Sequence, residues 1–184
     1  MTLLLRCALA LLLLQGAISA QADPNADLLT DVFVKVCLPN TGSPEAITAW
    51  AAERHLPEIT NAAGRKVFVG DGPSGTAWWL HGETTELVLS IRSTGACAVF
   101  AGNADPTALS GHFDEIVDRL STHGTEVAAL PDRSEPGPNG TRVGKLKIFS
   151  APDKRKLLVL TFITDERPGG AFQGSLQILM GSKD

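Results

Sequence analysis

The sequence predicts an α+β fold: two N-terminal helices, then an antiparallel sheet of six to eight strands, with one further helix packed on a face. Three observations lead to this prediction. Apolar residues recur at helical spacing in the first part of the chain, they alternate at period two in most later segments, and one more helical run interrupts those segments. Antiparallel strands that follow a group of helices are typical of α+β domains.

The first helix is predicted from Asp27, because apolar side chains then recur at helical spacing until Pro39 ends the run. These side chains are Leu28, Leu29, Val32, Phe33 and Val36. The second helix is predicted to begin at Ser43, a favourable N-cap residue, with Pro44 at the first helical position. It closes at the His-Leu-Pro segment of residues 55–57.

The central segment, residues 77–102, predicts three short strands joined by two turns. Its apolar and small residues alternate along residues 87–92 and 96–101, and Gly95 supplies the turn between these two runs. The third strand contains Trp78 and Trp79, which must point to opposite faces of the sheet. A further short strand is predicted just upstream, at residues 66–69.

The rest of the chain predicts one helix and an antiparallel meander. Asp105 and Pro106 begin the helix by the same N-cap logic, and a glycine at position 124 ends it. Alternating or strongly apolar runs then predict strands at residues 125–130, 142–150, 156–164 and 171–180. Residues 131–140, rich in proline and glycine, are predicted to form a loop.

Residues 1–22 are predicted to be a secretory signal peptide, which leaves residues 23–184 as a single α+β domain. Arg6 gives the segment a positive start, an apolar run follows, and Ala20-Gln21-Ala22 fits an A-x-A cleavage site. Cleavage is expected after Ala22, or alternatively after Ala20; a retained anchor is the competing interpretation. No later run is apolar enough to span a bilayer, so a periplasmic or secreted location is predicted.

The charge of the predicted mature domain argues against two classes of partner. Without Arg6 it has 15 Lys and Arg against 20 Asp and Glu, a formal net charge of −5. Nucleic acid and anionic lipid require clustered basic residues, which this composition does not supply. No motif indicates a cofactor, so none is predicted.

The cysteine count predicts one disulfide. Cys7 lies in the predicted signal peptide, which leaves Cys37 and Cys97 in the exported domain. Closing a loop of about 60 residues would stabilise the fold by roughly 4 kcal/mol in the chain-entropy model. The alternative is two reduced cysteines buried separately. Neither cysteine has a second Cys or His at zinc-motif spacing, so no metal site is predicted.

The candidate site residues divide between binding and catalysis. One of Trp78 and Trp79, together with His81 and Glu83, is a candidate partner-binding surface, because Trp is frequent among interface anchors. The competing interpretation is that both rings are buried, one in the core and one beneath the helical arm. A general-base role for His81 is the catalytic alternative. His112 and Glu115 are three residues apart on a helix, but a zinc site needs further converging ligands.

Three short motifs carry a family resemblance. Val36-Cys37-Leu38 at the end of the first helix, Trp78-Trp79-Leu80, and the G-x-C-x-V motif of residues 95–99 resemble those of small exported proteobacterial proteins without an assigned activity. The similarity covers residues 28–120 and implies a periplasmic fold containing the disulfide.

Together these observations favour a soluble, non-catalytic periplasmic binding protein whose partner is a protein of the cell envelope. An inhibitor or immunity protein for a secreted enzyme or toxin is one such function. The alternative is a small periplasmic hydrolase or metal-assisted enzyme that uses His81 or His112.

Overall fold

The computed structural model describes residues 23–71, 74–81, 86–121, 126–150 and 156–182. Within them, eight strands form one antiparallel sheet in the order β1-β2-β3-β8-β7-β6-β4, and β5 pairs with β6 beyond the end of β4. The strands are β1 (Gly75–His81), β2 (Glu86–Arg92), β3 (Cys97–Ala101), β4 (Glu126–Ala129), β5 (Arg133–Gly137), β6 (Gly140–Ser150), β7 (Lys156–Asp165) and β8 (Gly174–Ser182). The predicted fold class and strand number are confirmed.

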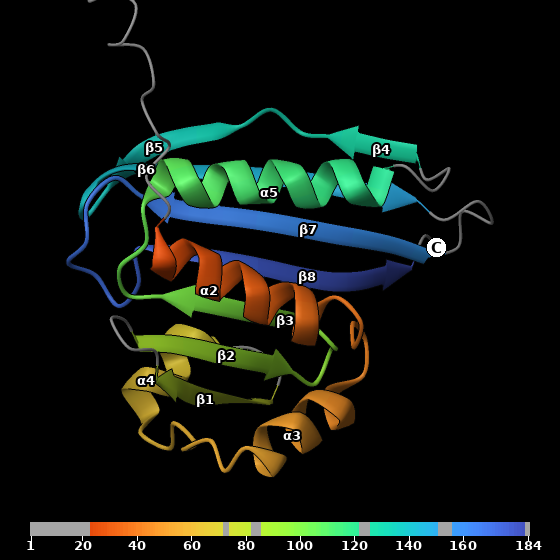
Figure 1. The fold of residues 1–184 in the computed structure, drawn as a ribbon, viewed down its shortest axis with the longest axis vertical. Coiled ribbons are helices and arrows are strands. Elements are labelled where there is room, and N and C mark those ends of the chain that lie inside the picture. Colours follow the sequence, from red (N-terminus) through yellow and green to blue (C-terminus); the bar gives the residue numbers. More distant parts are fainter. Residues whose placement is uncertain (1–22, 72–73, 82–85, 122–125, 151–155, 183–184) are drawn as a thin grey trace, which may run out of the picture.

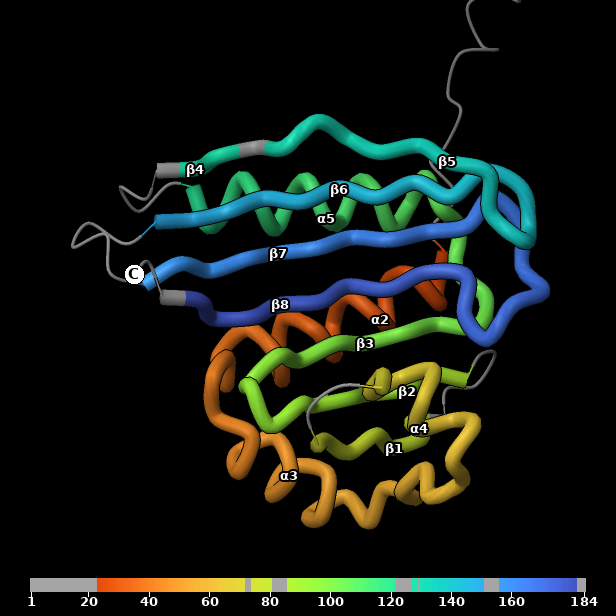
Figure 2. Tube along the Cα trace, turned by 180° about the vertical axis from the view of Figure 1, so that it is seen from behind, coloured from red at the N-terminus to blue at the C-terminus, as the bar shows by residue number. Residues whose placement is uncertain are grey.

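Helices lie on both faces of this sheet, but unequally. Helices α2 (Pro24–Val32) and α5 (Pro106–Ser121) lie side by side along one face, the helix face, with α3 (Pro44–Glu53) near its β1 end (Figure 1). The opposite face, called the outer face below, has one short helix, α4 (Ala62–Phe68), over β1 and β2 (Figure 2).

The first predicted helix is present and begins earlier than expected. The Asp23 carboxylate caps α2 by accepting a hydrogen bond from the Asn25 amide at 2.9 Å. The helix continues as a π-helical turn, η2 (Phe33–Cys37), in which the Leu38 amide donates to the Phe33 carbonyl at 3.0 Å. The second predicted helix is α3, with Pro44 in its first turn as expected, although the Ser43 side chain makes no capping hydrogen bond.

Two predicted elements are wrong. Residues 66–69 belong mostly to α4 rather than to a strand, because Asn61 provides an N-cap whose side chain accepts from the Gly64 amide at 2.7 Å. Part of the predicted loop at residues 131–140 is β5, which forms a hairpin with β6. Pro136 is compatible with this strand because β5 lies at the sheet edge, where a missing N–H donor costs little.

The two faces of the sheet contain separate hydrophobic cores. The larger core lies under α2, α3 and α5 and includes the fully buried Phe33, Phe113 and Phe162. The smaller core lies under α4 and includes Phe68, Val88, Ala98 and Phe100. In the part of the chain that the structure describes, no helix is long and apolar enough to cross a membrane.

Candidate functional site

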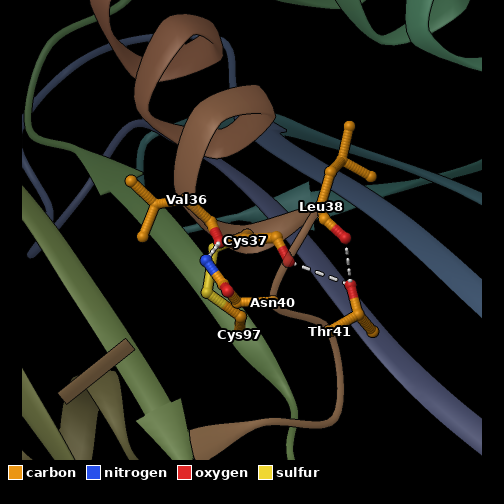
Figure 3. The surroundings of a disulfide bond; sticks show 6 residues. All are labelled: Val36, Cys37, Leu38, Asn40, Thr41 and Cys97. Atoms are coloured by element: carbon orange, nitrogen blue, oxygen red, sulfur yellow. Dashed lines mark hydrogen bonds between the residues drawn. A yellow bond between two sulfur atoms is a disulfide. The ribbon is translucent and has the colours of Figure 1, made fainter. Parts of the chain in front are cut away.

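The predicted disulfide joins Cys37, at the end of η2, to Cys97, at the start of β3 (Figure 3). Their Cα atoms are 5.5 Å apart and both residues are fully buried. Two backbone carbonyls at the end of η2 also accept hydrogen bonds from side chains. The Asn40 side-chain amide donates to the Val36 carbonyl, and the Thr41 hydroxyl donates to the Cys37 carbonyl, both at 2.9 Å. The disulfide therefore links the N-terminal helices to the sheet. Because both cysteines are buried, thiols in solution cannot readily reach it.

The two tryptophans point to opposite faces of β1, as predicted, and both pack against other side chains. Trp78 is 6% exposed in the larger core. Trp79 is half-buried on the outer face, with its ring 6.0 Å from that of Phe68 in α4. His81 ends β1, and Glu83 lies outside the described residues. A partner-binding role for this group stays a prediction; Trp78 is buried in the core, and Trp79 keeps part of its surface exposed.

His112 joins two helices. Its Nε2 atom lies 2.7 Å from an Asp27 carboxylate oxygen, which connects α5 to α2 at a partly exposed position. Within the described ranges, no three His, Cys, Asp or Glu side chains come together as metal ligands would. The arrangement supplies a pair that can fix two helices relative to each other.

The outer face carries an apolar surface that the sequence prediction missed. Register places the side chains of β6, β7 and β8 on alternate faces: Leu176, Phe162 and Lys145 are neighbours on the helix face. The intervening residues therefore point outward. We define the outer patch as the six aliphatic side chains that are half-buried or exposed there: Leu146, Ile148, Leu157, Val159, Ile163 and Leu179.

Both rows of side chains in β6 mix apolar and charged residues: Val143, Lys145 and Phe149 face the helices, and Arg142, Leu146 and Ile148 face outward. Leu146 and Ile148 lie in the outer patch, whereas Lys145 points toward the helices with only 13% of its side chain exposed. Its ammonium group contacts the Asp114 carboxylate of α5 at 2.8 and 2.9 Å and lies 5.7 Å from the ring centres of both Phe113 and Phe162. An ion pair and two aromatic faces thus stabilise the lysine inside, while leucine and isoleucine meet solvent.

A cavity of about 290 Å³ lies at one end of the outer patch. Its lining includes Leu130, Pro131, Arg133, Gly144, Leu146 and Ile163. Gly144 is the residue that leaves the space open: a Cβ atom there would meet nothing closer than the Phe162 carbonyl oxygen, 3.8 Å away. Glycine inside a strand weakens it and often marks a place where another group approaches closely, so this glycine is the sequence signal that could have located the cavity.

A buried ion pair fixes the polar wall of this cavity. Arg142 donates two hydrogen bonds to the Asp165 carboxylate, at 2.7 and 2.9 Å, and the Asp165 side chain is only 3% exposed. The hydrogen bond that Arg142 donates to the Asp165 carboxylate raises the pKa of Arg142, although burial works against this shift. Arg142 is therefore oriented and charged, and its charge is balanced by Asp165. Exposed Arg133 and Glu135 add one charge of each sign at the rim.

Both edges of the sheet resist addition of another strand. At β1, the Ile59 amide donates to the Ala77 carbonyl at 2.8 Å and the Trp79 amide to the Pro57 carbonyl at 2.9 Å, so the chain itself covers this edge. The opposite edge is divided between the short strands β4 and β5, and β5 contains Pro136. Proline and short strands are common protection against edge-to-edge pairing. The outer patch, unlike either strand edge, is left uncovered by the described helices and strands.

Comparison with protein-family models, with curated protein sequences and with solved structures gave no significant match.

Proposed function

We propose that this protein is an exported, non-catalytic binding protein whose outer patch binds a protein of the cell envelope. The observation that carries the proposal is the group of aliphatic side chains on the outer face of β6, β7 and β8, which flank Thr161 and Gln177 and which no described helix covers. Apolar side chains gathered on an open face can mark interaction sites. An inhibitor or immunity protein for a secreted enzyme or toxin would use such a surface.

Two observations support export. The Cys37–Cys97 disulfide is typical of proteins that fold in an oxidising compartment. Cleavage after Ala22 would also leave Asp23 as the first residue, and the Asp23 carboxylate accepts from the amides of Asn25 and Asp105. The proposed signal peptidase site would therefore leave these contacts in place. The intact mass of the protein exported by its native host checks this site.

The binding function is tested by photo-crosslinking in the producing cell. A photoreactive amino acid replaces Leu179, which is 39% exposed in the outer patch, and in a control replaces Val67, which is 43% exposed on α4. We expect a discrete protein adduct from position 179 alone. Equal or absent adducts at both positions would contradict the proposal.

The enzymatic alternative is separated by metal analysis and by activity screens on ester, lipid and cell-wall substrates. Stoichiometric zinc, or an activity that disappears in His81→Ala or His112→Ala, would favour a hydrolase or metal-assisted enzyme instead.

A further inference from the structure

We propose that the cavity above Gly144 binds a carboxylate attached to a compact apolar group, and that the carboxylate lies between Arg133 and Arg142. Such a ligand is a free organic acid or the C-terminal residue of a peptide, since both present the same chemistry. The proposal does not depend on the function proposed above, because a free acid would bind here even if the outer patch had no protein partner. Strand register, charge and the apolar lining of the cavity each support it.

Strand register places the position without a side chain, Gly144, inside a ring of four side chains. Along β6, its neighbours on the outer face are Arg142 and Leu146. Directly opposite it lie Arg133 of β5 and Ile163 of β7. All four residues line the cavity. The gap over the glycine is therefore bordered by two arginines on one side and by two aliphatic residues on the other.

The two arginines border the same gap. Arg133 is opposite Gly144, so it is the diagonal neighbour of Arg142 across the β5–β6 pair, at a distance of roughly 7–8 Å that long side chains can span. Within the part of the chain that the structure describes, the exposed Arg133 side chain makes no hydrogen bond or ion pair. Like charges on neighbouring positions of a sheet are destabilising, so an anion placed between the two guanidinium groups would relieve their repulsion.

Arg142 is already oriented for such an anion. Its Nε and Nη2 atoms donate to Asp165, whose side chain is 3% exposed and does not line the cavity. The Nη1 amino group has no hydrogen-bond partner among the described residues, and 34% of the Arg142 side chain is exposed. A planar guanidinium fixed from one side loses little further freedom when its remaining N–H groups bind a carboxylate, and charge-assisted hydrogen bonds of this kind are strong.

The other charged residues of the lining do not favour another class of ligand. The Lys145 ammonium group is held by Asp114 on the helix face, at 2.8 and 2.9 Å. Glu135, which is exposed and lies opposite Arg142, is the single acidic residue of the lining and faces two arginines. A cationic ligand would be repelled by both arginines. A carboxylate would instead replace Glu135 as the anion nearest to them.

The remaining lining calls for an apolar group next to the carboxylate. Leu130 and Pro131, from the segment between β4 and β5, line the cavity together with Leu146 and Ile163. An apolar group covered by these side chains is removed from water, which favours binding by about 25 cal/mol per Å² of buried surface. A hydrophilic anion such as phosphate would leave the aliphatic side chains in contact with water. The lining therefore selects an organic acid over an inorganic anion.

The test compares ligands that share the carbon skeleton of leucine, titrated into the purified, disulfide-bonded protein and followed by NMR. Isocaproate, isocaproamide and isohexylamine differ in the charge of the head group. An acetylated tetrapeptide that ends in leucine, with a free or an amidated C-terminus, places the same skeleton at the end of a chain. We expect binding of isocaproate, of the peptide acid or of both, with shifts in β5 and at residues 142–146. The amides and the amine should bind at least about tenfold more weakly. The tighter of the two acids identifies the source of the natural ligand.

Three variants and one control locate the carboxylate. Arg133→Gln removes an exposed charge and should weaken acid binding by about tenfold. Glu135→Gln removes the competing carboxylate and should strengthen acid binding several-fold. Gly144→Leu fills the gap, where a new Cβ atom would lie 3.8 Å from its nearest neighbour, and should weaken binding by about tenfold or more. Arg54→Gln, on α3, is the matched control for the lost positive charge and should leave binding unchanged.

Several outcomes would overturn the carboxylate site. These are no binding of either acid at millimolar concentration, equal binding of an acid and its amide, tighter binding of inorganic phosphate than of both acids, or unchanged affinity in Arg133→Gln. The two glutamine variants change exposed side chains, so they decide the matter even if Gly144→Leu fails to fold. Leu179 does not line the cavity. A crosslinked adduct at position 179 therefore tests the proposed function separately, and either proposal can fail without the other.

Discussion

The two halves of the outer face contain similar side chains in different surroundings. On β2 and β3, Val88 and Phe100 are 3% and 5% exposed because α4 and Phe172 pack over them. On β6, β7 and β8, the aliphatic residues of the outer patch are half-buried or exposed, although they belong to the same sheet. The apolar side chains of the covered half are explained by their burial, which stabilises the fold. Those of the open half are only partly buried and contribute less, and the proposed binding function would account for their presence.

The largest expected difference between the halves is in truncation of apolar side chains. Phe100→Ala removes a ring that contacts Phe68 and Phe172, with centroid distances of 5.2 and 4.9 Å. It should lower the free energy of unfolding by about 3–5 kcal/mol. Val159→Ala on the open half should cost only about 1 kcal/mol, since a partly exposed side chain loses less on truncation. Denaturant unfolding measures both, and equal losses would show that the halves do not differ.

Removal of the disulfide should have the next largest effect. Replacing Cys37 and Cys97 by alanine should lower the free energy of unfolding by about 2–4 kcal/mol, because the unfolded chain is no longer constrained. Since Cys97 is in β3, hydrogen exchange should rise first in β1–β3 and later in β6 and β7. The native protein should be two hydrogen atoms lighter than its dithiol form by mass spectrometry. Ready alkylation without a reductant would contradict the disulfide.

Polar substitution in the outer patch should hardly affect stability. Leu179→Ser changes a residue that is 39% exposed, and we expect less than about 0.5 kcal/mol of change in the free energy of unfolding. The same variant should reduce the fluorescence of an apolar dye that binds exposed hydrophobic surface. Val67→Ser on α4 is the matched control and should leave the dye signal unchanged. A large loss of stability in Leu179→Ser would mean that the patch is part of the core.

The smallest expected effect on stability concerns the hydrogen bond between Thr141, at the start of β6, and Glu166, just after β7. Glu166 accepts a hydrogen bond from the Thr141 amide at 2.9 Å, and this bond lowers the pKa of Glu166 below the ordinary glutamate value. Its stabilising contribution is therefore present above the unfolded-state pKa and is lost as the pH falls through the folded-state pKa. An NMR titration of the side-chain carboxyl should show the lowered value. Titration at the ordinary value would show that the turn is not held by this bond.

Local patterns in the sequence were enough for most elements. Period-two alternation or strongly apolar runs located the strands that became β2, β3, β6, β7 and β8, and the Asp-Pro and Ser-Pro starts located α5 and α3. The missed elements depend on distant contacts. Helix α4 has only seven residues, too few to be stable alone, and it is held by the packing of Phe68 on Trp79 and Phe100. Strand β5 exists because β6 supplies its hydrogen-bond partners.

The binding site was less predictable than the fold. Trp78 and Trp79 attracted the sequence-based prediction because large aromatic residues are frequent in interfaces. The structure packs both against neighbouring side chains and leaves smaller aliphatic residues at the surface. The signal for the cavity was the absence of a side chain at Gly144, which becomes informative only when the neighbouring strand and the residues around Leu130 are in place.

By itself, the sequence determined which side chains share a face of each strand, because successive residues of a strand point in opposite directions. It also predicted the disulfide, because only Cys37 and Cys97 remain once the predicted signal peptide is set aside, and two cysteines have one possible pairing. Only the tertiary structure decided which face is covered. In β6, both rows contain apolar side chains, and Lys145 lies inside because Asp114 of α5 meets its charge there. The covering helices come from distant parts of the chain, and no local pattern encodes where they pack.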